Sequence, residues 1–596
     1  MSTSNDPVVS SHDPIKQEKE QETDLEAQVE HKKRNERGNA FVGFLILIFV
    51  YYLLRGGSND NDKQEMSHSP GSCMDSESAA VSTSAKCYIP PVLTPAKEPK
   101  LGDDVSGIDY IRSPEFFNDS LVRFQELLRI PTVCYDDMGD VGDDDRFDIF
   151  AVFQDKVREL YPNIFKKLKV EYVNTYGLLI TLEGSNKDLK PLVLMGHQDV
   201  VPVNQASLDR WYFPPFSATY HNGHVYSRGA ADDKNSVVAI LEALEILAIS
   251  DYKPEQTVIA SFGFDEEVSG YRGALPLAHK LYERYGKDGV ALILDEGGFT
   301  INLFGTLFAT VCVAEKGYMD VHLKLKTPGG HASIPPPHTN IGLMSKLVTQ
   351  IEEPFGGELT FENPFYTTLQ CFAENSADMD DNLRQLIKSG DTEKMTDLFS
   401  KSRLYRYFFE TSIAVDVING GVKVNALPEE TTLAVNHRVD ASKGLKQVYD
   451  RYGGLLEEFG HEYHVNVTLF NGETVVEYED AIGHIFASTA KTLEPSPVSP
   501  YDESSDAYKK LAGAIRYTFG DGTSVTPALM PANTDTRHYW NLTSNIYRWT
   551  PVSTNSTSKN SFNGHTINEN MRYDAHMDSI EFFYNFILVS DSGEEA

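Results

Sequence analysis

The stretch Leu192-Val-Leu-Met-Gly-His-Gln-Asp-Val200 is the most informative part of the sequence. Its apolar first half predicts a buried strand, and its polar second half predicts a site where that strand ends. His197 and Asp199 are two residues apart, so their side chains share one face of an extended chain. A histidine beside a carboxylate is either a metal ligand with its orienting partner or a catalytic pair. This stretch alone does not choose between the two.

Length and charge limit the class of protein. The chain has 596 residues, of which 41% are hydrophobic and 11% aromatic. This length predicts about two folded domains with appendages. The formal net charge of −34 argues against a general nucleic-acid binder, because such proteins need basic patches. We therefore expect a globular protein whose partners do not include nucleic acid.

The N-terminal part differs in composition from the rest of the chain. Residues 1–37 are polar and typical of a disordered tail. Ala40–Leu54 is strongly apolar and predicts a transmembrane signal anchor over residues 38–55, followed by a polar stalk over 56–103. Basic residues cluster before this segment, so the positive-inside bias predicts a cytosolic tail and a lumenal body, as in a single-pass type II protein. A cleaved signal peptide and a buried core helix remain alternatives.

A lumenal body would pass through a compartment that glycosylates asparagine and oxidises cysteine. Sequons beyond the stalk predict glycosylation at Asn118, Asn466, Asn541 and Asn555. Cys73 and Cys87 are close in sequence and could pair in such a lumen. The other cysteines are expected to be ordinary core residues: Cys134, Cys312 and Cys371.

Helical and strand patterns alternate from about Asp104 onward. Helices are predicted at 113–128, 148–161 and 235–250, and strands near 178–182, 191–195, 257–264 and 290–294. Such alternation predicts an α/β fold in which helices flank a mostly parallel sheet.

Polar clusters follow the apolar runs at four further places. These clusters are Ser227–Lys234, Phe262–Val268, Leu294–Gly298 and Asn563–Glu569. The carboxyl ends of parallel strands converge on one crevice, so the clusters should meet there. Several acids beside two histidines would repel one another unless cations lay between them. Imidazole together with carboxylate suits zinc better than calcium or magnesium.

These motifs, in this order, resemble those of the two-zinc exopeptidase and aminoacylase family over about residues 104–590. The resemblance implies a zinc-exopeptidase-type catalytic domain in two parts, 104–315 and 470–596. It also implies an inserted, smaller α+β lid domain over 316–469. The anchor, the length and the run Thr534-Asp-Thr-Arg-His-Tyr539 resemble the fungal vacuolar members, which implies a vacuolar location.

The resemblance also implies a ligand set for two Zn²⁺ ions per chain. His197 would bind the first zinc, oriented by Asp199, and His565 would bind the second. Asp232 would bridge the two ions, and its peptide bond to Asp233 would be cis. The remaining ligands would be Glu296 for the first zinc and Glu267 for the second.

Two roles depend on neighbouring acids. Glu266 would be the general base, and its lone pairs must then stay free of metal. Because side chains alternate along a strand, Glu266 and Glu267 could divide the two roles at a strand end. Asp295 remains an alternative to Glu296, since both cannot face the site from a regular strand.

The resemblance places substrate-binding residues in the lid. His331 would help to hold the tetrahedral oxyanion, from the same chain in some relatives and from a partner chain in dimeric ones. Asn425 and Arg438 would also bind substrate, and an arginine suits a free carboxylate. Each of the three has a structural alternative: a loop histidine, a turn asparagine and a surface ion pair.

The implied activity is a metallocarboxypeptidase that releases C-terminal amino acids from short peptides. The first alternative is an amidase or synthase for N-acyl amino acids, since both substrate classes carry an amide next to a free carboxylate. A catalytically inactive, receptor-like protein is an alternative of another class. The oligomeric state remains open.

Overall fold

The computed structural model describes residues 87–102, 105–554 and 563–595. The expected cytosolic tail and anchor, most of the expected stalk, Cys73 and Asn555 lie outside these residues. In the described ranges, every helix is too short or too polar to cross a membrane. The description below concerns the described residues other than Arg210–Tyr212, which form one compact unit.

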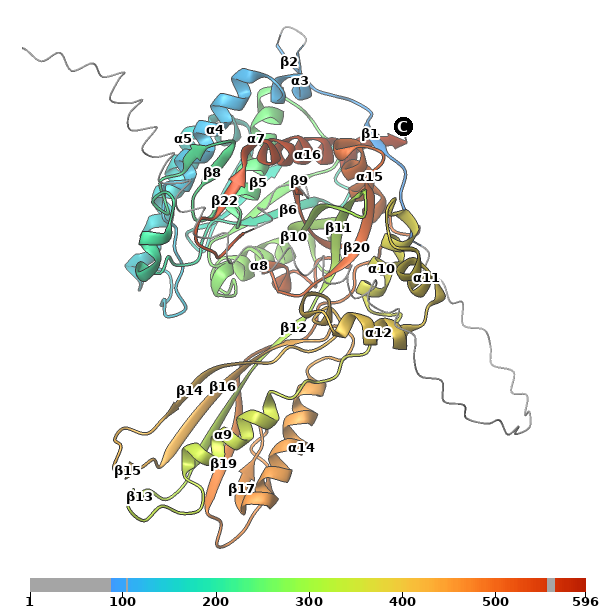
Figure 1. The fold of residues 1–596 in the computed structure, drawn as a ribbon. Helices are drawn as coiled ribbons and strands as arrows, with labels where there is room; N and C mark the ends of the chain where they lie inside the picture. Colours follow the sequence, from blue (N-terminus) through green and yellow to red (C-terminus); the bar gives the residue numbers. More distant parts are fainter. Residues whose placement is uncertain (1–86, 103–104, 555–562, 596) are drawn as a thin grey trace, which may run out of the picture. The chain divides into compact units, whose positions relative to one another are not determined.

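An eight-stranded sheet forms the centre of the fold, in the order β20-β11-β21-β10-β6-β9-β5-β4 (Figure 1). Neighbours β9, β6, β10 and β21 run parallel, as do β11 and β20. At the other edge, β5 is antiparallel to β9, and β4 is antiparallel to β5. The strands are β4 Lys169–Val173, β5 Gly177–Leu182, β6 Leu192–His197, β9 Val258–Gly263, β10 Leu292–Leu303, β11 Thr306–Glu315, β20 Ser524–Met530 and β21 Ile546–Thr554. The predicted α/β class with a largely parallel sheet is confirmed.

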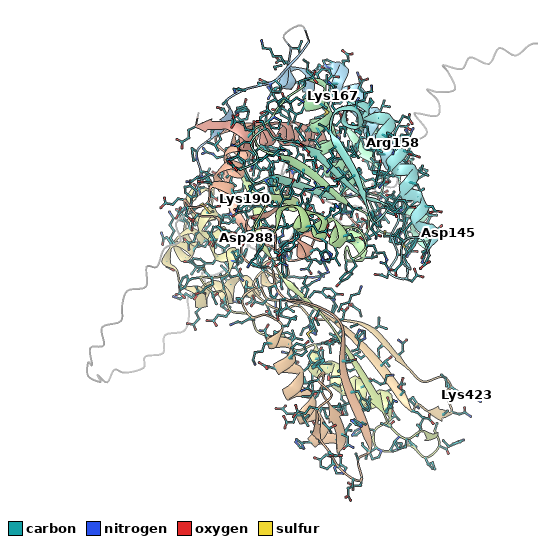
Figure 2. The ribbon with its side chains drawn as sticks, turned by 180° about the vertical axis from the view of Figure 1, so that it is seen from behind. Asp145, Arg158, Lys167, Lys190, Asp288 and Lys423 are labelled. Carbon is teal, nitrogen blue, oxygen red and sulfur yellow. A yellow bond between two sulfur atoms is a disulfide. The ribbon has the colours of Figure 1, made fainter. Side chains whose placement is uncertain are left out.

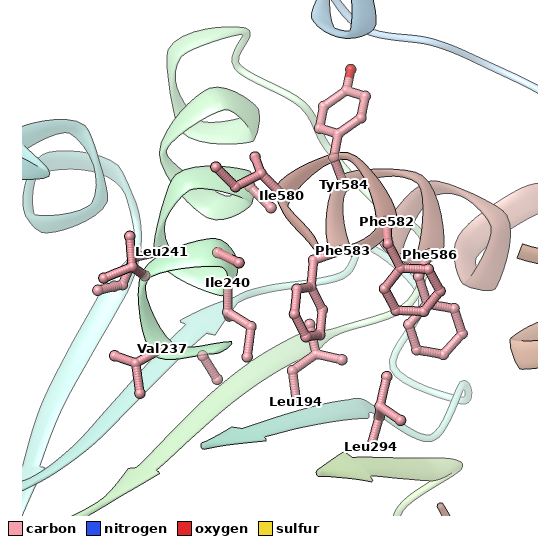
Figure 3. Close-up of a cluster of buried hydrophobic side chains, with 14 of the residues drawn as sticks. Leu194, Val237, Ile240, Leu241, Leu294, Ile580, Phe582, Phe583, Tyr584 and Phe586 are labelled. Atoms are coloured by element: carbon pink, nitrogen blue, oxygen red, sulfur yellow. The ribbon is translucent and has the colours of Figure 1, made fainter. Parts of the chain in front are cut away.

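Helices cover both faces of this sheet. The sheet and these helices together are called the body here. Along β6 the side chains alternate, so that Leu194 packs in the cluster with α7 and α16 and Met195 in the cluster with α8 (Figure 3). In Figure 3, α7 and α16 lie side by side, with Ile240 and Phe583 pointing toward the strands. The helices of the body are α3 Gly107–Ile111, α4 Pro114–Leu128, α5 Ile149–Leu160, α6 Pro162–Lys167, α7 Lys234–Ile249, α8 Ala274–Tyr285, α15 Asp506–Phe519 and α16 Tyr573–Ser592.

A second sheet forms the lid, with six strands in the order β14-β16-β12-β19-β17-β18. Its strands are β12 Gly317–Lys326, β14 Ala414–Gly420, β16 Glu430–Val439, β17 Val465–Thr468, β18 Thr474–Val476 and β19 Gly483–Leu493, covered by α9 Asn340–Ile351 and α14 Lys446–Tyr463. The lid therefore continues past the expected end at residue 469. Strand β19 pairs with both β12 and β17, so the chain returns to the body only after Leu493.

One part of the expected lid belongs to the body instead. Helices α10 Pro364–Asn375, α11 Asp381–Ser389, α12 Thr392–Ser400 and α13 Arg403–Arg406 form a cluster that packs on β11. The rings of Phe308 and Phe372 are 4.7 Å apart between centroids, and the Thr368 hydroxyl donates to the Pro527 carbonyl at 2.7 Å. These contacts join the α10–α13 cluster to β11 and β20.

The described end of the expected stalk is also part of the body. Strand β1, Leu93–Pro95, pairs antiparallel with the C-terminal strand β23, Gly593–Glu595, and β2 Lys100–Leu101 pairs with β3 Val105–Ser106. Cys87 forms a disulfide with Cys371 of α10, so the expected pairing with Cys73 and the expected free Cys371 are both wrong. Cys134 and Cys312 are free and buried, as predicted.

Candidate metal centre and active site

Three of the predicted site residues lie at or just beyond the point where the pairing of β6 with its neighbours β9 and β10 ends. His197 is the last residue of β6, and Glu266 begins a 3-10 turn, Glu266–Val268, directly after β9. Glu296 lies in β10, which is parallel to β6. Parallel strands present their carboxyl ends at one edge of a sheet, and this brings the three residues together.

Asp232 lies between two histidines and faces each with a different oxygen. Its Oδ1 is 3.1 Å from Nε2 of His197, and its Oδ2 is 3.2 Å from Nε2 of His565. Glu296 Oε1 is 3.5 Å from His197 Nε2, and Glu267 Oε2 is 3.0 Å from His565 Nε2. The arrangement thus has two halves that share Asp232, and the Asp232–Asp233 bond is cis, as the resemblance implied.

Asp199 is fully buried and supports the cluster in two ways. Its Oδ1 lies 3.3 Å from Nδ1 of His197, which fits the predicted orienting role. Its two oxygens also accept hydrogen bonds from the backbone N–H groups of Glu266 and Glu267, each at 3.1 Å. Sequence reasoning missed this second role, because it depends on how β6 and β9 pair.

Glu266 and Glu267 do not lie at a strand end, as was expected, but on the 3-10 turn after β9. Their side chains still differ in surroundings, because of these two carboxylates that of Glu267 contacts His565, whereas no such contact is found for Glu266 in the described part of the chain. Burial raises the pKa of Glu266 well above its ordinary value; His197 lowers it and Glu296 raises it further. A positive charge nearby would be needed to keep this carboxylate ionised.

The structure brings Glu296, rather than Asp295, to His197. The pairing of β10 with β21 shifts register between Asp295 and Gly298, so the strand is irregular at this point. Asp295 is buried, and its Oδ2 has no hydrogen-bond partner among the described residues. Burial and the Glu296 charge raise the pKa of Asp295 to about 7.

The donor set fits a pair of cations. Ligand atoms of His197, Asp232 and Glu267 lie within 4.8 Å of one another, and so do those of His197, Asp233 and Glu296. Burial raises the pKa of Glu267 to about 7, so this acid titrates near neutrality without a cation. Imidazole nitrogens combined with carboxylates are typical zinc ligands. Asp233 is a candidate that sequence reasoning missed, and its only sequence signal was its place beside Asp232.

Arg438 lies at the base of the lid, opposite Tyr318 in the pairing of β16 with β12. Its guanidinium lies over the Tyr318 ring, 4.9 Å from the centroid, and its Nη1 donates to Oδ1 of Asn533 at 2.9 Å. Asn533 in turn donates to the carbonyl of Lys316, the residue before β12. Burial lowers the pKa of Arg438, and the Glu266 charge partly offsets that effect. Arg438 is therefore held at the start of the lid through Asn533.

His331 and Asn425 lie together at the other end of the lid. His331 is in β13, Gly330–His331, which pairs with β15, Ala426–Leu427, and Asn425 directly precedes β15. Figure 1 shows both strands at the end of the lid opposite the start of β12, and Figure 2 labels Lys423 at this tip. Both residues are exposed, and in the described chain neither has a recorded contact with the acids and histidines above.

The three described sequons differ in accessibility. Asn118 on α4 and Asn541 are exposed, whereas Asn466 in β17 is half-buried and its side chain accepts a hydrogen bond from the backbone of Tyr478 at 2.7 Å. A glycan on Asn466 therefore requires a local rearrangement that the other two sites do not.

Comparison with known proteins identifies the family. The model of peptidase family M20/M25/M40 matches residues 193–589, which include His197, Asp232, Glu266 and His565. The chain belongs to this family. It is 39% identical to carboxypeptidase S of Saccharomyces cerevisiae, over 80% of this chain and 85% of that one. It is 31% identical to the N-fatty-acyl-amino acid synthase/hydrolase PM20D1 of Mus musculus, over 81% and 90% of the two chains.

Solved structures share the M20 fold with this chain at low sequence identity. Human carnosine dipeptidase 1 matches with a TM-score of 0.56 and 14% identity, over 80% of this chain and 97% of that one. An M20 family metallo-carboxypeptidase from Sulfolobus solfataricus matches with a TM-score of 0.54 and 18% identity, over 79% and 98%. The chain is therefore a hydrolase of a peptidase family, with a possible metal-binding group at the edge of its main sheet.

Proposed function

We propose that the protein is a zinc-dependent carboxypeptidase that releases C-terminal amino acids from short peptides. The observation that carries the proposal is the position of Asp232 between His197 and His565, with a contact to each. The relation to carboxypeptidase S supports the choice of substrate. A receptor-like protein without activity would not need these buried acids, whose mutual repulsion is costly.

The chain's residues would hold two zinc ions. His197 and Glu296 would bind one, His565 and Glu267 the other, and Asp232 both. When bound, zinc would polarise the scissile carbonyl and make water acidic enough to attack near neutral pH.

Glu266 would hold the proton that the attacking water loses and would pass it to the leaving amine. Its carboxylate has no hydrogen bond to either histidine among the described residues, so its lone pairs are available for this step. Asp199 would fix the backbone of Glu266 relative to His197, because one carboxylate contacts both.

Restriction to the C-terminus would come from Arg438. Its guanidinium is largely withdrawn from water and lies over Tyr318, near Glu266. A free α-carboxylate can accept two parallel hydrogen bonds from a guanidinium, whereas an internal peptide bond cannot. An uncharged group in that place would leave a desolvated cation without a partner, which is costly.

The rival function is the hydrolysis or synthesis of N-acyl amino acids, favoured by the PM20D1 relatives. Both substrate classes end in a free carboxylate, so Arg438 would serve either one. The two substrate classes differ on the acyl side, for which we propose a cavity of about 410 Å³ that adjoins Glu267 and Val268. Its wall also contains Tyr135, Asp136 and Asp137. Exposed acids suit a peptide better than an alkyl chain, which would have to desolvate them.

We further propose that His331 and Asn425 act on the site of a second copy of the chain. Strand β12 has ten residues and starts at the base of the lid. At about 3.3 Å per residue it spans roughly 33 Å, and His331 lies beyond its far end. The tip of the lid is therefore far from its base, so in this proposal a partner chain supplies the tip to the site. The oligomeric state under assay conditions tests this point.

The location of the enzyme is proposed from the sequence and from one disulfide of the structure. The signal-anchor segment at 38–55 would hold the body in the vacuolar lumen, with glycans on the accessible sequons Asn118 and Asn541. The Cys87–Cys371 disulfide supports an oxidising route, because such bonds are rare in cytosolic proteins. Glycosidase digestion and protease protection in sealed vesicles test this topology.

The deciding experiment measures zinc content and product release by the purified protein. The substrates are a blocked dipeptide, its C-terminal amide, a free dipeptide and a fatty-acyl amino acid. We expect about two zinc ions per chain and rapid release from the peptide acids only. Preferential hydrolysis of the fatty-acyl amino acid would replace the proposal by its rival, and no hydrolysis by the zinc-loaded protein would refute both.

A further inference from the structure

Two loops that carry ligand residues are joined by a small sheet outside the main one. Strand β8, His224–Tyr226, pairs antiparallel with β22, Asn570–Arg572, and β7, Thr219–His221, completes this sheet. The chain leaves β8 toward Asp232, and it enters β22 from His565. The Asp232 loop therefore begins beside the end of the His565 loop, although more than three hundred residues separate Asp232 and His565 in sequence.

Glu569 is the last residue of the His565 loop before β22, and it is fully buried. Its Oε1 accepts hydrogen bonds from the backbone N–H groups of Ala231, at 3.0 Å, and of Asp232, at 3.2 Å. Its backbone carbonyl accepts a third bond from the N–H of Ser227 at 3.1 Å. The carboxylate thus holds the backbone of the residue proposed to bridge both metal ions.

Arg228, in the loop that leads from β8 to Asp232, also joins the two loops. Its Nη1 donates to Oε2 of Glu569, and both side chains are almost fully buried. The same nitrogen lies 3.3 Å from the carbonyl oxygen of Thr566, the residue after His565. Arg228 and Glu569 therefore link the backbone at Asp232 to the backbone beside His565.

His565 has need of such a support. Its side chain is 55% exposed, and its backbone has a φ of 63°, in the left-handed region. By contrast, the His197 side chain is 1% exposed and belongs to a strand of the main sheet. Packing therefore fixes His197 but leaves His565 dependent on hydrogen bonds within its loop.

We propose that Glu569 and Arg228 form a buried clamp that sets the spacing between Asp232 and His565. The clamp rests on the proposed function, since it matters only if these residues hold metal. Glu569 is in this view a positioning residue, because it acts through the backbone of Asp232. Loosening the clamp should weaken metal binding at His565 and Glu267 more than metal binding at His197 and Glu296.

The test compares Glu569→Gln with the wild-type protein. Glutamine keeps the shape and one oxygen, but it removes the charge opposite Arg228. Outer partners of metal ligands typically change metal affinity by roughly 10-fold to 100-fold. We expect zinc competition with a chelator to show one of the two affinities falling by about this factor, and the other changing little.

Two further variants separate positioning from folding. Arg228→Lys keeps the positive charge but removes the planar guanidinium, and it should lower the affinity for the same zinc ion. Glu242→Gln is the matched control, because Glu242 on α7 is equally buried and is paired with Arg123 at 2.7 Å. It should lower the melting temperature of the metal-free protein without changing either zinc affinity.

The outcomes distinguish the clamp from the proposed function. Two tight zinc ions in wild-type protein and in both clamp variants would overturn the clamp and leave the function intact. An equal loss of affinity for both zinc ions in Glu569→Gln would also overturn the clamp, since the substitution would then affect the whole site and not the spacing of one half. Wild-type protein that binds fewer than two ions would overturn the proposed metal function and the clamp with it.

Discussion

Asp199 accepts a hydrogen bond from the backbone N–H of Glu266, with 3.1 Å between the nitrogen and Oδ1. The same carboxylate lies 3.3 Å from Nδ1 of His197. One buried acid thus fixes a proposed metal ligand and the proposed base relative to each other. This link has consequences for metal affinity and for turnover.

We expect Asp199→Asn to lower zinc affinity by roughly 10-fold to 100-fold, as for other partners of metal-bound histidines. The asparagine amide has one acceptor oxygen, so either Glu266 or Glu267 loses its backbone hydrogen bond. Turnover should therefore fall even when zinc is saturating. Equilibrium zinc titration and kcat at high zinc measure the two effects. Unchanged kcat at full loading would contradict the link to Glu266.

Glu266→Gln should retain zinc and lose turnover. Proton transfer by a positioned side chain contributes roughly 100-fold to 10,000-fold, and glutamine cannot accept the proton. Zinc content by metal analysis and kcat on a blocked dipeptide check the expectation. The matched variant is Glu267→Gln, which should instead lose zinc, because Glu267 contacts His565. Identical behaviour of the two variants would show that their roles are not divided.

Arg438→Ala should reduce kcat/KM for a peptide acid by about 10-fold to 100-fold, which corresponds to the free energy of one hydrogen bond to a charged group. Cleavage of the corresponding amide should change little, because the amide makes no such bond. The ratio of the two kcat/KM values is the measurement. Arg451→Ala is the control, since this lid arginine lies over Phe355, 4.4 Å from the ring centroid. A preserved preference for the acid in Arg438→Ala would assign carboxylate binding to another residue.

Removing the disulfide should destabilise the body without abolishing the site. Cys87 and Cys371 are 284 residues apart in sequence, and closing a long loop restricts the unfolded chain. We expect the double variant Cys87→Ala/Cys371→Ala to lose about 2–5 kcal/mol of unfolding free energy. Denaturant unfolding with and without reductant measures this loss. Reductant should destabilise the wild-type protein but not the variant; equal sensitivity of the two would contradict the bond.

Local patterns in the sequence predicted much of the body. The apolar runs at β5, β6 and β9 and the helix at α7 were placed to within a few residues. Alternation along an extended chain also put His197 and Asp199 on one face. The acids at strand ends were predicted to converge because parallel strands share an edge, and the structure brings Asp232, Glu267 and Glu296 to the two histidines.

The sequence by itself thus determined the central strands β5, β6, β9 and the start of β10, the helices α4, α5 and α7, and the chemical character of the site, because these depend on periodicity and residue type over short stretches. Only the tertiary structure decided that Cys87 meets Cys371 and that the lid sheet extends to Leu493. It alone placed Glu569 against the backbone of Asp232. Such contacts join residues hundreds of positions apart. Their free energy depends on burial and hydrogen-bond geometry, which no local pattern encodes.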